Sequence, residues 1–249
     1  MSQSFLQLFL MNFRIIYRNR TGLFFALIMP VLIYVALSLL PIGRLFADDV
    51  NYAQYVLPGI IALTIMQGGI YGLAYWWVDL KSRNVIKRFL VTPLKPSELM
   101  ASVLLSRIIV ALMQVVLLTL VGWIWFGTTL NITMAFGLVF AVLGAAIFLL
   151  LGLIIASFAD TYEAAAPITA AVGLPLTFLG NIFYPISSLP AGLRQVAELL
   201  PITYLSDAMR SVYLNNGTWA DWGTDAGMLI FWLVIITALA YRTFRLQAD

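Results

Sequence analysis

The sequence DLKSRNVIKRFLVTPLKPSELMASVLLSR, Asp79 to Arg107, separates two long apolar runs and decides the fold. Its basic side chains are Lys81, Arg83, Lys87, Arg88, Lys95 and Arg107. So many charges are too costly to place in the hydrocarbon of a membrane, and Lys and Arg gather on the cytoplasmic side of membrane spans. The stretch therefore predicts a cytoplasmic connection between two membrane helices.

The composition is that of an integral membrane protein. Of the 249 residues, 62% are hydrophobic and 10% are charged, and the mean hydropathy is +0.97, whereas a soluble domain is about one-quarter charged. The chain has no Cys and no His, which excludes disulfides, thiol chemistry and His-based metal sites. The net charge of +3 indicates no nucleic-acid partner, because the basic residues are explained by membrane topology.

Charge-free runs on both sides of Asp79–Arg107 predict an all-α membrane protein with six spans in one domain, residues 1–249. The run from Ile108 to Ala159 is more than twice the length of about 20 residues that one helix needs, and the turn-rich Gly127–Asn131 divides it. Gly68 and Gly72 have the spacing of a close-packed helix face. The predicted spans are about 22–42, 54–80, 103–126, 133–157, 164–184 and 226–243.

The distribution of basic residues predicts the topology. With six spans, all of the Lys and Arg residues except Arg44, Arg194 and Arg210 lie on the same side of the membrane as the Asp79–Arg107 connection. We therefore expect a multi-pass protein of the cell inner (plasma) membrane with both termini in the cytoplasm. Residues 3–18 have phenylalanines on one side and Arg14 and Arg18 on another, which predicts an amphipathic helix in contact with membrane lipid at the interface; the alternative is a simple cytoplasmic leader.

Two segments after the fifth span are too broken by Pro, Ser and Gly to cross a membrane. They are YPISSLPAGL, Tyr184 to Leu193, and LLPITYLSDAMR, Leu199 to Arg210. Short helices that dip into the outer leaflet would suit such a sequence, because backbone in hydrocarbon must be hydrogen-bonded internally. We expect this outer re-entrant segment to cover residues 185–214.

The polar residues indicate that energy for any transport comes from outside the chain. The predicted spans are almost empty of the ionisable groups that bind coupling ions or relay protons. The chain has no Gly-rich phosphate loop, and no nucleophile–base pair accompanies Glu98, Asp160 or Glu163, so we expect no enzymatic site. Candidates for polar groups along a substrate pathway are Gln67, Gln114 and Asn181; the alternative is that they hydrogen-bond between helices.

Taken together, these features resemble the permease subunits of ABC type-2 exporters. The resemblance covers essentially the whole chain, and Thr92 and Pro93 carry it in the inner connection. Asn84 departs from the pattern, since many relatives have Gly there. In the outer segment the matching residues are Pro185, Leu189, Pro190, Pro201, Tyr204 and Arg210.

The resemblance implies a coupling helix that docks in a groove of a separate nucleotide-binding ATPase. That helix would consist of Asn84, Val85, Ile86, Lys87, Arg88, Phe89 and Leu90, with the aliphatic residues and Phe89 as an apolar anchor and the basic residues as a rim. The turn with Asp160 and Glu163 would be a second contact. The alternative is that the basic connection only sets topology.

The implied assembly pairs this chain with a second copy or a homologous permease, above two ATPase subunits. The ATPase would bind ATP and Mg²⁺, and this chain would bind no cofactor. The cargo would be amphiphilic: a drug-like molecule, a lipid or a lipid-linked glycan. Two other functions stay open, namely an ATP-independent carrier or lipid scramblase, and a structural membrane anchor for an ATPase.

Overall fold

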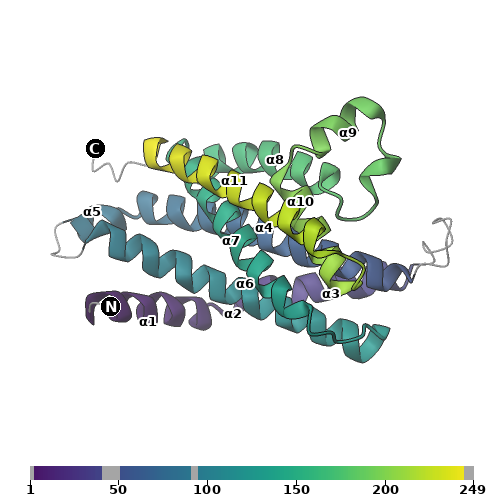
Figure 1. Ribbon diagram of the computed structural model, residues 1–249. Coiled ribbons are helices and arrows are strands. Elements are labelled where there is room, and N and C mark those ends of the chain that lie inside the picture. The colour runs from purple at the N-terminus through teal and green to yellow at the C-terminus, as the bar shows by residue number, and fades with distance from the viewer. Residues whose placement is uncertain (1–2, 41–50, 91–94, 244–249) are drawn as a thin grey trace.

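The computed structural model describes residues 3–40, 51–90 and 95–243, and these form a bundle of helices (Figure 1). Within these ranges, six helical stretches are long and apolar enough to cross a membrane, which confirms the predicted all-α fold with six candidate spans. The first is built from α2 (Arg20–Leu23), the π-helical turn η1 (Phe24–Ile28) and α3 (Met29–Ser38). The others are α4 (Tyr52–Ser82), α6 (Pro96–Phe126), α7 (Met134–Ser157), α8 (Tyr162–Leu179) and α11 (Trp219–Thr243).

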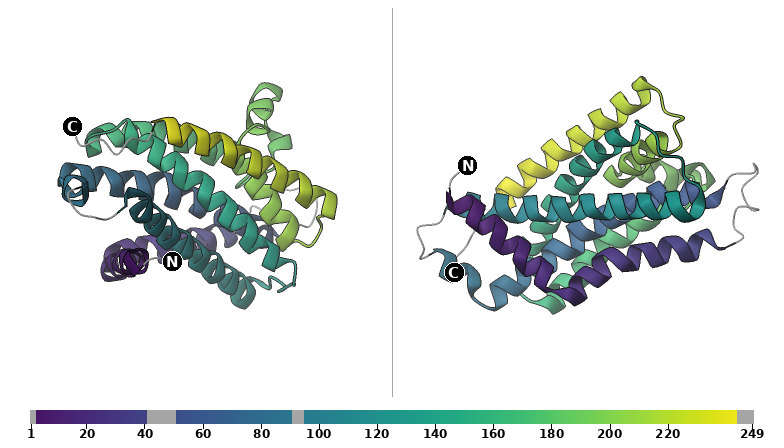
Figure 2. Two further views of the ribbon diagram at one scale, coloured as in Figure 1. Left: turned by 60° about the vertical axis from the view of Figure 1, so that its left-hand side comes forward. Right: turned by 90° about the horizontal axis from the view of Figure 1, so that it is seen from below.

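Short helices lie at both ends of the bundle. At one end, α1 (Gln3–Arg18) runs beside α6, and α5 (Val85–Leu90) follows the end of α4 (Figure 1). The buried Asn12 of α1 donates from Nδ2 to Ser102 Oγ of α6 at 3.0 Å. The segment after α8 contains a 3₁₀ turn, Ile186–Ser188, followed by α9 (Ala191–Ala197) and α10 (Pro201–Tyr213). Figure 2 shows α9 projecting from the bundle.

Helix α4 is the centre of the bundle. In its most apolar window 78% of the residues are buried, compared with 11% in the first span and 17% in α11. Its neighbours include α6, α7, α8 and α10. The first span and α11 are as apolar as core helices but mostly uncovered, so lipid or another chain must cover their outer faces.

The closest approach in the core is between α4 and α7. A Cβ atom at Gly69 would lie 2.5 Å from the carbonyl carbon of Phe148, and one at Gly152 would lie 2.3 Å from the carbonyl oxygen of Gly69. The prediction that Gly68 and Gly72 form the close-packed face is wrong. Gly68 has nothing within 4 Å of its Cβ position, and Gly72 faces the side chain of Arg107. The four-residue spacing identified the helix but not the side that packs.

We expect the substitution Gly69→Ala to destabilise the protein by about 1–3 kcal/mol, because the methyl group meets backbone that cannot move aside. The measurement is the thermal unfolding midpoint of the purified protein in a fixed detergent. Gly68→Ala, at the residue directly before it, is the matched control, and it should be neutral or slightly stabilising, since Ala favours a helix and space is available. Equal midpoints for the two variants would contradict this account of the contact.

Pro30 lies inside the first span and interrupts the hydrogen bonding of its helix. Its nitrogen carries no hydrogen, so the carbonyl of Ala26, four residues earlier, loses its helical donor. The chain contains a π-helical turn just before this point, Phe24–Ile28. Gln114 Nε2 on α6 donates to Ala26 O at 2.7 Å, which supplies the missing hydrogen bond and joins the first span to α6.

Candidate functional site

The predicted coupling segment contains a short helix directly after α4. Asn84 has a φ of 54°, in the left-handed region, and this residue turns the chain from the end of α4 into α5. Ile86 is only 6% exposed and packs with the chain's own core, whereas Arg88 is exposed and Val85 is partly exposed. Ile86 therefore attaches α5 to this chain and is unavailable to a partner. Lys87, Phe89 and Leu90 lie in α5 with side chains outside the described part, and Thr92 and Pro93 lie outside the described residues.

The left-handed φ explains why Asn can occupy position 84, where the family pattern has Gly. Glycine adopts this conformation without cost and Asn tolerates it better than other L residues, whereas a β-branched residue is strained there. We expect Asn84→Gly to leave thermal stability within about 0.5 kcal/mol and Asn84→Val to lower it by about 1–2 kcal/mol. Because Asn84 is exposed, packing contributes little to the difference. Unfolding midpoints of the two variants test the prediction, and a Val variant as stable as the Gly variant would refute it.

An ion pair joins the end of α4 to the turn between α7 and α8. Lys81 Nζ lies 3.0 Å from Asp160 Oδ1, and it also donates to the carbonyl oxygens of Ala156 at 3.3 Å and Ala159 at 3.4 Å. The cation thus caps the last turn of α7, where free carbonyls favour positive charge. Asp160 remains 91% exposed. The structure therefore joins the end of α4, which leads into α5, to the Asp160 turn.

The prolines of the outer segment begin its helices. Pro185 precedes the 3₁₀ turn, Pro190 precedes α9, and Pro201 is the first residue of α10, a position where its missing N–H costs nothing. Tyr204 donates from its hydroxyl to the carbonyl of Glu198 at 2.6 Å. Thr203 donates to the carbonyl of Ala197 at 2.6 Å. These bonds fold α9 back onto the start of α10.

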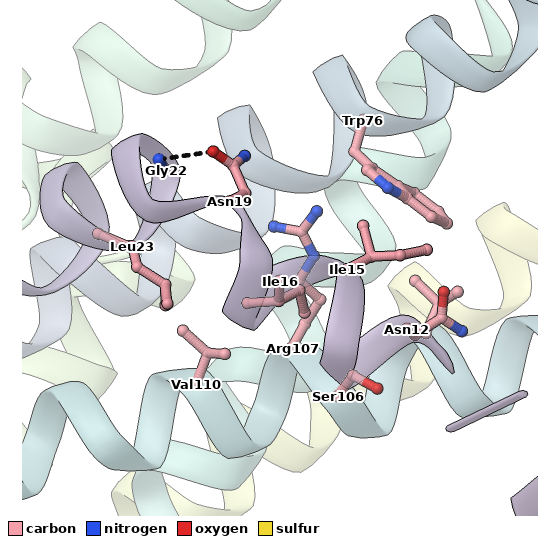
Figure 3. A pocket seen from close by; sticks show the side chains of 12 residues that line it. Asn12, Ile15, Ile16, Asn19, Gly22, Leu23, Trp76, Ser106, Arg107 and Val110 are labelled. Carbon is pink, nitrogen blue, oxygen red and sulfur yellow. Dashed lines mark hydrogen bonds between the residues drawn. The ribbon is translucent and has the colours of Figure 1, made fainter. Parts of the chain in front are cut away.

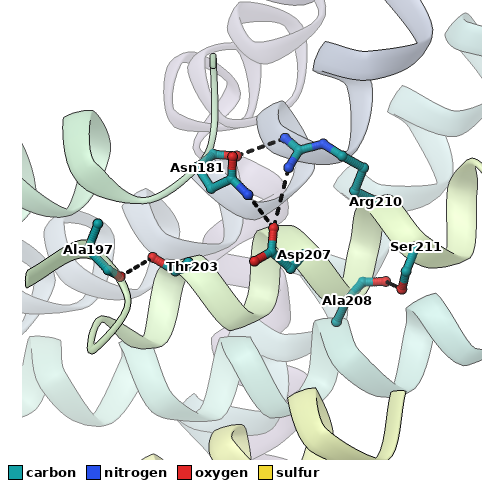
Figure 4. Close-up of polar contacts among 7 residues, drawn as sticks. All are labelled: Asn181, Ala197, Thr203, Asp207, Ala208, Arg210 and Ser211. Atoms are coloured by element: carbon teal, nitrogen blue, oxygen red, sulfur yellow. Dashed lines mark hydrogen bonds and ion pairs between the residues drawn. The ribbon is translucent and has the colours of Figure 1, made fainter. Parts of the chain in front are cut away.

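A charged network anchors α10 inside the bundle (Figure 4). The side chain of Arg210 is 11% exposed; its Nη2 donates to the carbonyl of Asn181 at 2.7 Å and its Nη1 lies 3.4 Å from Asp207 Oδ1. Asn181 Nδ2 also donates to Asp207 Oδ1. On the other side, the guanidinium lies 4.1 Å from the ring centroid of Tyr55 on α4. The network therefore connects three separate elements: the end of α8, α10 and α4.

Burial and pairing act on the charge of Asp207 in opposite directions. Burial raises the pKa of Asp207, and the Arg210 guanidinium and the Asn181 amide act in the opposite direction. The sequence pointed to Asn181 and Arg210 as site residues but not to Asp207 and Tyr55. The i, i+3 spacing of Asp207 and Arg210 on an otherwise apolar helix was a signal for the first. No local pattern pointed to Tyr55.

The three predicted pathway residues lie in different places. Gln67 is exposed and lines a cavity of about 680 Å³ between the first span, α4, α6, α7 and α8. Gln114 lines the same cavity, but its amide is bonded to Ala26 O. Asn181 belongs to the charged network far along the chain from either. The structure thus brings Gln67 and Gln114 together and separates Asn181 from them.

Arg107 lines this cavity as well, which the sequence did not predict. The sequence placed Arg107 at the polar end of a span, but α6 begins at Pro96, so Arg107 lies well inside the helix. Its guanidinium carbon is 5.8 Å from the ring centroid of Trp76 on α4. A smaller adjoining cavity of about 140 Å³ is lined by Asn12, Asn19, Ser106 and Arg107, among others (Figure 3).

Comparisons with known proteins give one consistent result. A model of the ABC-2 type transporter family matches residues 3–214. The chain is 24% identical over 234 residues to the inner membrane transport permease YadH of Escherichia coli (strain K12), covering 88% of this chain and 87% of the relative. It is 28% identical over 211 residues to the daunorubicin resistance ABC transporter permease protein DrrB1 of Streptomyces coeruleorubidus, covering 82% and 71%.

A further relative is the probable multidrug ABC transporter permease YbhR of Escherichia coli (strain K12). It is 24% identical over 221 residues, which cover 84% of this chain and 56% of that protein. The family match includes both the α5 segment and the outer segment with the charged network. The chain belongs to the ABC-2 type transporter family, and its relatives are ABC transporter permeases.

Proposed function

We propose that this chain is the transmembrane permease of an ATP-binding cassette exporter that moves an amphiphilic substrate out of the cell. A separate nucleotide-binding subunit binds ATP and Mg²⁺ and hydrolyses the nucleotide. The permease lies in the inner membrane with both termini in the cytoplasm, and two permeases face each other. Membership of the ABC-2 family supports the general role. The name of DrrB1 refers to daunorubicin resistance and that of YbhR to multidrug transport, and both support an amphiphilic cargo.

The observation that carries the proposal is the path of α4. This helix runs without interruption from Tyr52 to Ser82 and is the most buried of the candidate spans. At one end of α4, Arg83 and Asn84 lead into α5, and near the other end Tyr55 contacts Arg210 of the charged network. A displacement of α5 by an ATPase would therefore move α4 and reach α10 at the opposite end of the bundle.

The cavity beside α4 supports an amphiphilic cargo. Its lining combines aromatic side chains, including Tyr71 and Trp76, with the amides of Gln67 and Gln114. About 680 Å³ is within the range of pockets that hold drug-sized molecules. A second copy would enlarge this space, because the first span and α8 are largely uncovered, with 11% and 22% of their apolar windows buried.

A photo-crosslinking residue in place of Arg88, an exposed basic residue of α5, tests the proposal. Complexes extracted from native membranes in mild detergent are crosslinked and identified by mass spectrometry. We expect a nucleotide-binding ATPase at this position and none at Trp219, a 74% exposed residue on α11 that serves as the control. A folded protein with no ATPase at Arg88 would overturn the proposal in favour of a carrier or scramblase that works without ATP.

A further inference from the structure

Arg107 points into a cavity without an anionic partner. Figure 3 shows its guanidinium rising from α6 into the space between Asn19, at the turn from α1 to α2, and Trp76 on α4. In the part of the chain that the structure describes, no carboxylate lies within ion-pair distance of it and it makes no hydrogen bond. Its guanidinium carbon lies over the ring of Trp76, 5.8 Å from the ring centroid.

The carboxylate that shares a cavity with Arg107 is already engaged by another cation. Asp79 lines the larger cavity together with Arg107, but its Oδ1 accepts from Arg83 Nε at 2.8 Å. A guanidinium that is largely withdrawn from water and lacks an anion is costly, and intramembrane cations are usually paired. The negative charge that would balance the Arg107 guanidinium is therefore best supplied by a ligand.

Small residues on α4 keep space open around the guanidinium. A Cβ atom at Gly72 would lie 3.3 Å from Arg107 Nη1, and a Cβ atom at Gly68, one turn away, would meet nothing within 4 Å. Gly72 and Gly68 both line the larger cavity, and Asn12, Asn19 and Ser106 add polar side chains to the smaller one. The guanidinium thus has room for a polyatomic anion and neighbours that can contact it.

The depth of Arg107 matches a lipid headgroup. About 20 residues of α6 separate Arg107 from Gly127 at the other end of the helix, or about 30 Å at 1.5 Å per residue. This is the thickness of a bilayer's hydrocarbon core. In the proposed topology Arg107 then lies at the inner boundary, where phosphate groups of lipids are found. Ile15 and Phe25, at the rim of the two cavities, are 49% and 56% exposed, so apolar chains can pass between the cavity and the lipid.

We propose that Arg107 binds the phosphate of a membrane amphiphile that enters this cavity from the inner leaflet. The planar guanidinium offers two parallel N–H groups to phosphate oxygens, a geometry that Arg supplies and Lys does not. The apolar part of the amphiphile lies along the first span and the aromatic wall formed by Trp76. This assignment rests on the proposed membrane topology and names the chemistry of a ligand, which is a resident phospholipid or the transported substrate itself.

Binding of dodecyl phosphate to the purified full-length chain in a neutral detergent tests the site. We expect Arg107→Gln to weaken binding at least about tenfold and Arg107→Lys to fall between this variant and the wild type. Arg242→Gln, which removes an exposed cation from the last turn of α11, should bind like the wild type. Unfolding midpoints of all variants verify that each protein is folded. Equal affinity of the Arg107→Gln variant and the wild type, or no binding by the wild type, overturns the proposal.

Two further measurements separate the sources of the phosphate. Mass spectrometry of lipids that co-purify with the wild type, but not with Arg107→Gln, identifies a resident phospholipid. Stimulation of ATP hydrolysis by dodecyl phosphate in the reconstituted complex, lost in Arg107→Gln, identifies a substrate site. Because the binding assay contains no ATPase, it reports on the Arg107 site even if the crosslinking experiment at Arg88 refutes the transport function.

Discussion

Replacing Asp207 with Asn is expected to lower the stability of the protein by about 2–3 kcal/mol. The substitution keeps the shape of the side chain and removes the charge that faces Arg210, whose own side chain is only 11% exposed. Arg cannot lose its proton, so the cation stays in the bundle with only Asn181 O and the Tyr55 ring as partners. Breaking a fully buried pair costs about 3–5 kcal/mol; the 38% exposure of Asp207 places this pair below that range.

A double variant and a surface control make the test specific. The Asp207→Asn, Arg210→Met protein contains neither charge, so it should recover more than half of the lost stability, as removal of both members of a buried pair often does. Glu198→Gln removes the same kind of charge from the Arg194–Glu198 pair, at 2.8 Å, whose side chains are 51% and 46% exposed. It should cost less than about 1 kcal/mol. Thermal midpoints in one detergent measure all three, and a cost at Asp207 no larger than that at Glu198 would contradict the structural role of the network.

The sequence predicted those features that depend on local chemistry. Long charge-free runs fix the existence of the spans, because any helix that crosses hydrocarbon must be apolar over about 20 residues. Pro190 and Pro201 predicted a broken outer segment, and both residues occur where helices start. The short helix after Asn84 followed from family resemblance, and the left-handed φ of Asn84 gives the reason why Gly suits this position.

The features that the sequence did not predict depend on which face of a helix meets its neighbours. Four-residue spacing at Gly68 and Gly72 is consistent with a packed face, yet Gly69 makes the backbone contact with α7. Only the arrangement of α4 against α6 and α7 decides between these sides. The same holds for Arg107: its charge suggested the end of a span, but α6 extends beyond a bilayer's thickness, so a charge near its start still lies inside a helix and beside a cavity.

Loss of the ATPase from the complex is the expected result of the double substitution Val85→Asp, Arg88→Glu. These residues are three apart in α5 and therefore share one face, which is partly exposed at Val85 and exposed at Arg88. The substitutions place an acid in the apolar part of the proposed docking face and reverse the charge at its rim. Central residues of such interfaces contribute about 2 kcal/mol or more, so association should weaken at least about thirtyfold and export should fall with it.

The permease itself should remain folded in this variant, because Ile86, on another side of α5, retains its contact with the core. Arg242→Glu provides a charge reversal on α11 at the same end of the bundle and should leave the ATPase bound. The measurement is the amount of ATPase that co-purifies with each variant, together with its size-exclusion profile. Undiminished co-purification with the α5 variant would mean that the ATPase docks elsewhere, with the Asp160 turn, held beside α4 by Lys81, as the next surface to test. Export that persists after the ATPase is lost would instead show that transport does not depend on ATP hydrolysis. The proposal that α4 transmits movement from the ATPase to the rest of the bundle would then lose its basis.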